Sequence, residues 1–135
     1  MVDPDFGMMQ HNGIDAWDCR VEFAFPHPGA RFFAVHLWAS QDGPSERQRD
    51  VFRQLQSRYR ELWPNIAKAL LAIHQALESA DDLNNLVTEH VGVHIGEQAE
   101  DSVELVYTLV LADEGNRAYF VPLRNWKIVD VIMAD

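Results

Sequence analysis

A long apolar stripe in the middle of the chain constrains its fold more than any other feature. From Val51 to Leu77, apolar side chains recur at intervals of three and four residues, the period of one face of an α-helix. Ser45 stands just before this stripe, and Gln48 follows three residues later, which is the pattern of a helix capping box. The sequence therefore predicts an amphipathic helix over residues 45–80.

The length of this helix predicts a bend within it. A continuous helix over these residues would be about 54 Å long at a rise of 1.5 Å per residue. A folded domain of 135 residues is only about 37 Å across. Pro64 lies near the middle, has no N–H to donate to the carbonyl of Arg60 and crowds that carbonyl with its ring. We therefore expect a kink or a short break near Arg60–Trp63 that keeps both halves on one layer.

The segments on either side of the helix alternate with a period of two, which indicates strands. Before the helix, strands over 20–25 and 31–39 are separated by a Pro- and Gly-containing turn and predict a hairpin. After the helix, the pattern predicts a meander of four strands, near 87–95, 103–111, 118–122 and 126–132.

These elements predict an α+β fold with one mostly antiparallel sheet of about six strands. The chain order is two strands, a long kinked helix and a four-strand meander, with the helix packed on one face of the sheet. Residues 1–13 are interpreted as a loosely ordered lead-in, and residues 14–135 as a single domain.

Composition narrows the compartment and the partners. The single cysteine, Cys19, cannot form an intrachain disulfide, and neither a signal peptide nor a membrane-spanning run is recognisable, so we expect a cytoplasmic protein. The formal net charge is −10, with the acids concentrated in residues 81–135. Such a charge disfavours nucleic acid and favours a basic protein partner, although acidity also serves solubility alone.

The sequence predicts no metal site, no cofactor and no enzymatic activity. His90 and His94 would share a metal ion on a helix, but on a strand they are about 13 Å apart at 3.3 Å per residue. Cys19 has no recognisable base beside it in the sequence and is interpreted as a small apolar group. No nucleophile elbow or phosphate-binding glycine-rich loop is present in the sequence.

One set of polar residues is expected on the face of the sheet opposite the apolar stripe. Glu22, His36 and Glu104 all point to that face of their strands, with Trp38 beside His36. If the strands are neighbours, these residues form a groove for binding or for general acid–base chemistry. The alternative is a sheet face that is polar because water covers it.

The acidic turns offer two candidate sites for a basic partner. In a meander, the start of strand 87–95 lies beside the end of strand 103–111, so the turns at the two ends of these strands gather acids. One end holds Asp81, Asp82, Asp113 and Glu114, and is the preferred partner-binding site. The other end holds Glu97, Glu100 and Asp101. The alternative at both ends is a solvated turn.

Four segments together resemble a known group of bacterial domains. They are Phe33-Ala34-Val35-His36-Leu37, Gly43-Pro44-Ser45-x-x-Gln48, Glu104-Leu105-Val106-Tyr107 and the closing strand from Trp126 to Val131. Over residues 20–132 the chain resembles immunity proteins of polymorphic and contact-delivered toxin systems. The resemblance implies a cytoplasmic protein that binds and occludes one cognate toxin, with a basic toxin domain as the partner expected from the charge. It assigns no binding residue.

A second interpretation stays open on the sequence alone. The chain could serve as a non-enzymatic structural or adaptor domain that forms a homodimer through its sheet. An enzyme that uses the face with Glu22, His36 and Glu104 is a more distant third.

Overall fold

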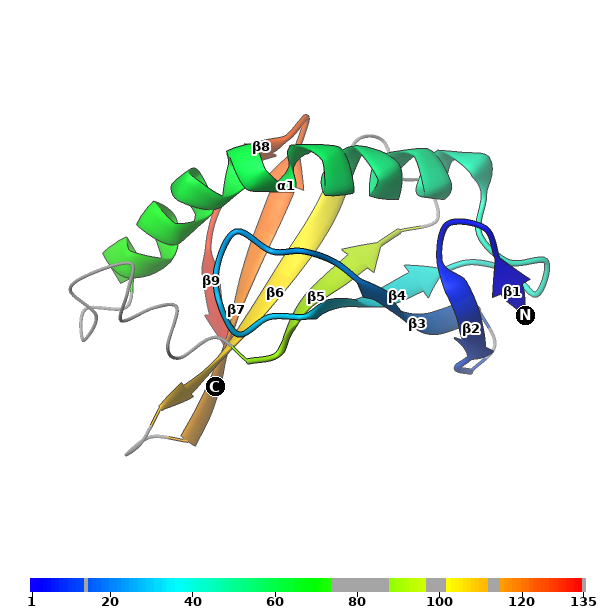
Figure 1. Cartoon of the computed structure of the whole chain (residues 1–135), viewed down its shortest axis with the longest axis horizontal. Helices are drawn as coiled ribbons and strands as arrows, with labels where there is room; N and C mark the ends of the chain where they lie inside the picture. Colours follow the sequence, from blue (N-terminus) through cyan, green and yellow to red (C-terminus); the bar gives the residue numbers. More distant parts are fainter. Residues whose placement is uncertain (14, 74–87, 97–101, 112–114, 135) are drawn as a thin grey trace.

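The structure is a computed structural model that describes residues 1–13, 15–73, 88–96, 102–111 and 115–134. Within these residues the chain forms one helix, α1 (Glu46–Ile73), and nine strands in one sheet (Figure 1). The strands are β1 (Val2–Asp3), β2 (Gly7–His11), β3 (Ala16–Glu22), β4 (Phe32–Trp38), β5 (His90–Ile95), β6 (Ser102–Leu111), β7 (Gly115–Arg124), β8 (Lys127–Ile128) and β9 (Ile132–Ala134).

The sheet follows the chain order from β1 to β8, and β9 pairs with β7 beside β8. Among the described strands, β4 and β5 are the one parallel pair, and every other pairing is antiparallel. A parallel pair needs a long connection between its strands, and here that connection contains α1. The predicted α+β class, the hairpin and the mostly antiparallel sheet are confirmed.

The helix begins where the capping box predicts. Oγ of Ser45 accepts a hydrogen bond from the backbone N–H of Gln48 at 3.1 Å, and Oε1 of Gln48 accepts one from the N–H of Ser45 at 3.0 Å. The helix continues through Pro64 without a break, and Figure 1 shows its axis bending as it crosses the sheet. The predicted bend is therefore present, whereas residues 74–80 of the predicted helix lie outside the described residues.

The core lies between α1 and one face of the sheet. The apolar stripe of the helix faces inward-pointing positions of β4, β5 and β6, and these side chains are at most 8% exposed. Burying one such Leu, Ile or Phe contributes roughly 1.5–3 kcal/mol, so this layer is a major source of stability. Its members include Phe52, Leu55, Ile66, Leu70, Val35, Leu37, Val91, Val93, Leu105 and Leu109.

The interpretation of residues 1–13 as a lead-in is wrong, because they supply β1 and β2 to the sheet. Asp3, only 4% exposed, is paired with Arg49 of α1 at 2.8 Å, and Asp5 is paired with Arg53 at 2.7 Å. Phe6 is fully buried and stacks on Phe52. The segment is fixed by partners on a distant helix, which local polarity does not reveal.

The sheet is also larger than the six predicted strands. Besides β1 and β2, the expected last strand over 126–132 is divided into β8 and β9, which both pair with β7. The first predicted strand begins earlier, at Ala16, and ends at Glu22, so that Phe23 and Phe25 follow it. Phe23 and Phe25 still pack on Phe33 in the core.

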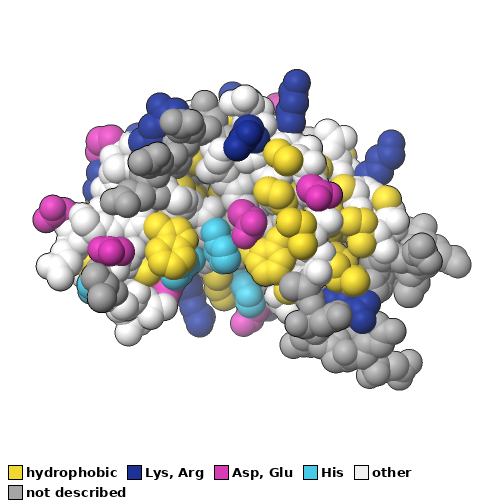
Figure 2. Space-filling model, turned by 180° about the vertical axis from the view of Figure 1, so that it is seen from behind, with side chains coloured by type: hydrophobic (Ala, Val, Ile, Leu, Met, Phe, Trp, Pro, Cys, Tyr) yellow, Lys and Arg dark blue, Asp and Glu magenta, His cyan; other side chains and the backbone are white. Residues whose placement is uncertain are grey.

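No helix in the described part of the chain is long and apolar enough to cross a membrane. The face of the sheet opposite α1 is hereafter called the open face. Figure 2 shows the molecule from behind, with histidine, acidic and hydrophobic side chains close together on this side of the surface. This face carries the candidate site.

Candidate functional site

Four polar residues form a continuous row across four neighbouring strands of the open face. Asp18 of β3 lies opposite His36 of β4, His36 lies opposite His94 of β5, and His94 lies opposite Glu104 of β6. Directly opposed residues on one face of a sheet are close enough for their side chains to interact. We call these four residues the polar row.

The first half of the polar row is a short hydrogen bond. Nδ1 of His36 and Oδ1 of Asp18 are 2.6 Å apart, and their side chains are 24% and 45% exposed. An ionised carboxylate has no hydrogen to donate, so Nδ1 of His36 is the donor. The bond fixes the orientation of the ring and leaves Nε2 as its second polar atom.

The second half is looser. Nδ1 of His94 lies 3.4 Å from Oε1 of Glu104, and the rings of His36 and His94 are 5.6 Å apart between centroids. Trp38 packs edge-on against His36 at 4.8 Å, yet its side chain remains 52% exposed. The row therefore consists of two adjacent imidazoles, each with a carboxylate partner, beside an exposed indole.

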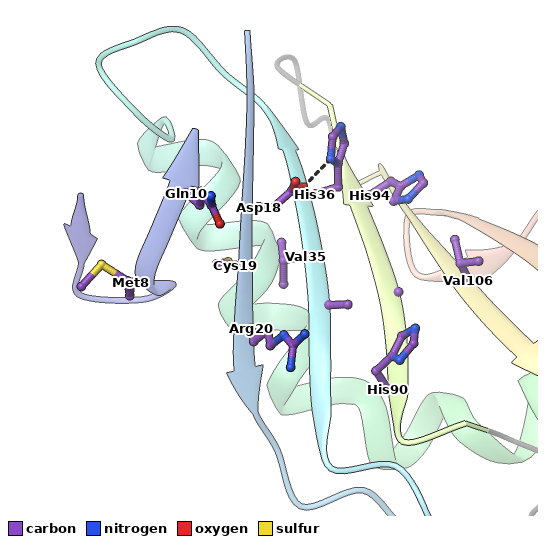
Figure 3. A pocket seen from close by; sticks show the side chains of 12 residues that line it. Met8, Gln10, Asp18, Cys19, Arg20, Val35, His36, His90, His94 and Val106 are labelled. Atoms are coloured by element: carbon purple, nitrogen blue, oxygen red, sulfur yellow. Dashed lines mark hydrogen bonds and ion pairs between the residues drawn. The ribbon is translucent and has the colours of Figure 1, made fainter. Parts of the chain in front are cut away.

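A groove of about 740 Å³ lies beside the polar row on the open face (Figure 3). Its floor contains Ala34 and Gly92, which lie opposite each other on β4 and β5. A Cβ at Gly92 would lie 2.9 Å from Cβ of Val106, so this position favours glycine. Arg20 and His90 also line the groove. We call the groove with these residues and His36 and His94 the histidine groove.

The structure brings together most of the groove that the sequence predicted on this face. His36, Trp38 and Glu104 lie at the polar row, with His94 between His36 and Glu104. Glu22 is displaced from them, because it lies opposite Phe32 at the far end of β3. That this face binds a partner or carries out acid–base chemistry stays a prediction.

Sequence reasoning missed two members of the polar row. Asp18 precedes the first predicted strand, so its face was not assigned. His94 was considered only with His90, whereas its neighbours are His36 and Glu104 on other strands. The alternation of β3 back to Trp17 was the available signal for Asp18. The chain between β4 and β5 contains α1, so no local pattern in the sequence indicates that these two strands pair.

The acidic sites predicted at the two ends of the meander cannot be placed. Asp81, Asp82, Asp113 and Glu114, and likewise Glu97, Glu100 and Asp101, lie outside the described residues. Both sites stay predictions.

The histidines were also considered as metal ligands. His90 and His94 lie on one strand, β5, as the strand pattern predicted. In the described residues, no group of three or more His, Cys, Asp or Glu side chains is arranged to hold a metal ion. The polar row therefore consists of one hydrogen-bonded pair, Asp18 with His36, and one looser ion-pair contact, His94 with Glu104.

Cys19 lies beneath the groove but is unsuited to nucleophilic chemistry. It is a free cysteine, buried between β2 and β4. Burial, reinforced by the charges of Asp18 and Asp3, raises the pKa of its thiol to about 12. The reactive thiolate is therefore scarce at neutral pH.

Comparisons of the chain with protein-family models, with curated proteins and with solved structures found no match.

Proposed function

We propose that this protein is an immunity-type inhibitor that binds one cognate bacterial toxin through the open face of its sheet and occludes it in the cytoplasm. The observation that carries the proposal is the exposed Trp38 beside the polar row, on the face that α1 leaves uncovered. The mechanism is steric and requires no reaction on the inhibitor.

The composition of this face supports a protein partner. Tryptophan is enriched among the residues that dominate binding energy at interfaces, and an exposed one is costly to leave in water. A second hollow, of about 470 Å³, adjoins Trp38 and is lined by Glu104, Pro122, Arg124 and Val129. Such a mixture of apolar and charged side chains suits the core and rim of a protein interface.

The net charge supports a basic partner. At −10, the chain attracts a basic domain at long range, which accelerates association and makes it sensitive to salt. On the open face, Asp18 and Glu104 are partly exposed carboxylates beside the indole of Trp38. A lysine or arginine of the toxin could pair with a carboxylate and lie against the indole ring.

The test is inhibition of a toxin domain encoded next to the gene for this protein. We expect the purified protein to bind that domain saturably and to abolish its activity at equimolar ratio, measured by calorimetry and by the toxin's own assay. Trp38→Ala should weaken binding by roughly thirtyfold, which corresponds to about 2 kcal/mol at a hot spot.

Val2→Ala is the control, because Val2 is exposed on β1, the strand at one edge of the sheet and three strands away from Trp38 on β4. It should bind as the unmodified protein does. Full toxin activity in the presence of excess folded protein would refute the inhibitor function. Inhibition that is unaffected by Trp38→Ala would move the binding surface away from the open face.

A second candidate function, a non-enzymatic structural or adaptor domain that forms a homodimer, is favoured by one observation. In the described residues β9 pairs with β7 alone, through three residue pairs, and it exposes Ile132 and Met133. An edge strand with exposed apolar side chains can pair with a second copy. Sedimentation velocity over a range of concentrations tests this, with Ile132→Lys expected to give monomers if β9 forms the interface.

A further inference from the structure

The histidine groove has basic side chains on three sides of a small-residue floor. Ala34 and Gly92 lie side by side on β4 and β5, and Arg20 of β3 lies in the same row, opposite Ala34. His36 and His94 lie two residues further along β4 and β5. His90 lies two residues before Gly92 on β5. Figure 3 shows His36 and His94 at one end and Arg20 and His90 towards the other.

Aromatic packing holds the lower end of the groove in place. The guanidinium of Arg20 lies 4.9 Å from the ring centroid of Phe32, and the ring of His90 stacks on the same Phe32 at 5.7 Å. A guanidinium over an aromatic ring keeps its N–H groups at the ring's rim, where they remain able to donate. Arg20 and His90 are thus anchored to one side chain.

At the upper end, the hydrogen bond with Asp18 sets the orientation of His36. Because Nδ1 donates to Asp18, Nε2 can donate a second hydrogen bond to an anion only from the doubly protonated, cationic form of the ring. Asp18 is the one carboxylate among the described residues that line this groove, and it is already paired with His36. The remaining titratable groups that line it are Arg20, the three histidines and the buried, neutral thiol of Cys19.

The dimensions suit a polyatomic anion. His90 and His94 are four residues apart on one strand, about 13 Å between their Cα atoms at 3.3 Å per residue. A phosphate group offers several acceptor oxygens to donors that approach from different sides, which suits this arrangement better than a single metal ion does. The volume of about 740 Å³ exceeds what one phosphate needs and lies within the usual range of roughly 300–1,000 Å³ for small-molecule sites.

We propose that the histidine groove binds a phosphate-bearing small molecule, with Arg20, His36, His90 and His94 as donors to the phosphate and Ala34 and Gly92 providing the space. Arginine forms paired hydrogen bonds with phosphate oxygens, and imidazole N–H groups add single ones. The groove is a local concentration of basic side chains on a chain whose net charge is −10. This proposal is independent of toxin inhibition.

The experiment is an NMR titration of the intact chain with inorganic phosphate and with a nucleoside 5′-monophosphate, against sodium chloride of equal ionic strength. We expect saturable shifts of the His36, His90 and His94 ring resonances and of the Arg20 side chain. Tighter binding of the nucleotide would identify a phosphomonoester as the ligand, whereas equal affinities would identify the free phosphate group as what is recognised. Both results support the proposal.

Two variants make the result specific. Arg20→Gln should weaken phosphate binding by roughly tenfold or more, as expected for loss of a charged hydrogen-bond donor. Ala34→Leu keeps every donor but fills the floor, and should abolish binding of the nucleotide. Arg124→Gln is the matched control on the same face, because Arg124 lines the other hollow, and should leave the affinity unchanged.

Three results would overturn the proposal. They are shifts with sodium chloride that match those with phosphate, shifts spread evenly over the whole surface, and equal loss of affinity in Arg20→Gln and Arg124→Gln. The NMR spectrum of each variant reports its folding directly, so an unfolded variant cannot be mistaken for a weak binder.

Discussion

The side-chain amide of Gln48 donates a hydrogen bond to the backbone carbonyl of Trp38 at 2.8 Å. The same nitrogen lies 3.0 Å from the carbonyl of Gly96 and 3.5 Å from that of Ile95. Gln48 is fully buried, and its Oε1 caps the helix through Ser45. One residue therefore joins the start of α1 to the carboxyl ends of both parallel strands, next to the exposed Trp38.

Gln48→Glu should destabilise the fold by roughly 3 kcal/mol or more. The carboxylate can still accept from Ser45, but it removes both amide donors and places a buried charge against backbone carbonyls. Urea denaturation at pH 7 measures the change. Gln56→Glu, a half-buried position on the same helix, is the matched control and should change stability by less than about 0.5 kcal/mol. Equal urea midpoints for Gln48→Glu and Gln56→Glu would show that the hydrogen bonds of the Gln48 amide contribute nothing to stability.

Asp3→Asn should destabilise the fold by about 1–3 kcal/mol. Burial alone would raise the pKa of Asp3, but hydrogen bonds from Arg49 and from the backbone N–H groups of Asp5 and Phe6 together lower it. Asparagine keeps an acceptor for the backbone and loses the charge that pairs with Arg49. Asp42→Asn, at an exposed position, serves as the control in the same urea titration.

The stability that the Asp3–Arg49 pair contributes changes with pH in a definite direction. Because the pKa of Asp3 is lower in the folded state than its ordinary value of 3.8, its contribution is fully present above that value. It is lost as the pH falls through the lower, folded pKa. The stability gap between the unmodified chain and Asp3→Asn should therefore shrink below pH 4, and a gap that widens there would contradict the pairing.

What the sequence predicted well was local in origin. The period of the helix stripe, the Ser45–Gln48 capping box and the alternation of the meander strands each depend on near neighbours, and all three are present. The bend at Pro64 also follows from one residue's missing N–H.

What the sequence did not predict depends on contacts between distant residues. Residues 1–13 pair with β3 through β2, and side-chain contacts with Arg49, Arg53 and Phe52, more than forty positions away, hold the segment against α1. The polar row requires β4 to lie beside β5, and no local pattern encodes that pairing. Candidate site residues on single strands could therefore be found from sequence, but not the neighbours that turn them into a site.

Asn125→Ala should destabilise the chain by roughly 0.5–1 kcal/mol, whereas Asn125→Gly should leave its stability nearly unchanged. Asn125 and Trp126 both have positive φ, 51° and 63°, in the two-residue turn between β7 and β8. Such turns favour Asn and Gly at the first position, because most other side chains are strained at positive φ. Thermal unfolding of both variants measures the change. A melting temperature for Asn125→Ala equal to that of the unmodified chain would contradict the strain argument.

Cys19 should resist modification by thiol reagents in the folded protein. Its thiol is buried, and a pKa of about 12 leaves almost no thiolate at pH 8. We expect no reaction with a thiol-specific disulfide reagent over an hour in buffer, and complete reaction within minutes in 6 M guanidinium chloride. Rapid labelling of the folded chain would show that the space beneath the histidine groove opens.

Between pH 7 and pH 4, His27 should make the fold less stable as acid is added. His27 is 2% exposed, Nε2 bonds the hydroxyl of Tyr59 at 2.8 Å, and Tyr59 bonds Tyr107 at 2.8 Å. Nδ1 is buried and has no hydrogen-bond partner within the described residues. Burial lowers the pKa of His27 from 6.5 to about 4, so the folded state holds the ring neutral.

The fold loses stability in acid because the unfolded chain binds a proton at His27 more readily than the folded chain does. The contribution of His27 is complete above pH 6.5 and is progressively lost as the pH falls towards 4, by roughly 3 kcal/mol at 1.36 kcal/mol per pKa unit. His27→Phe removes this titration and the bond to Tyr59. It should therefore be less stable than the unmodified chain at pH 7, with the difference narrowing or reversing at pH 4.5. Urea midpoints of both proteins at each pH measure this, and the other titrating groups cancel in the difference. A gap that stays constant with pH would show that the buried ring is not held neutral.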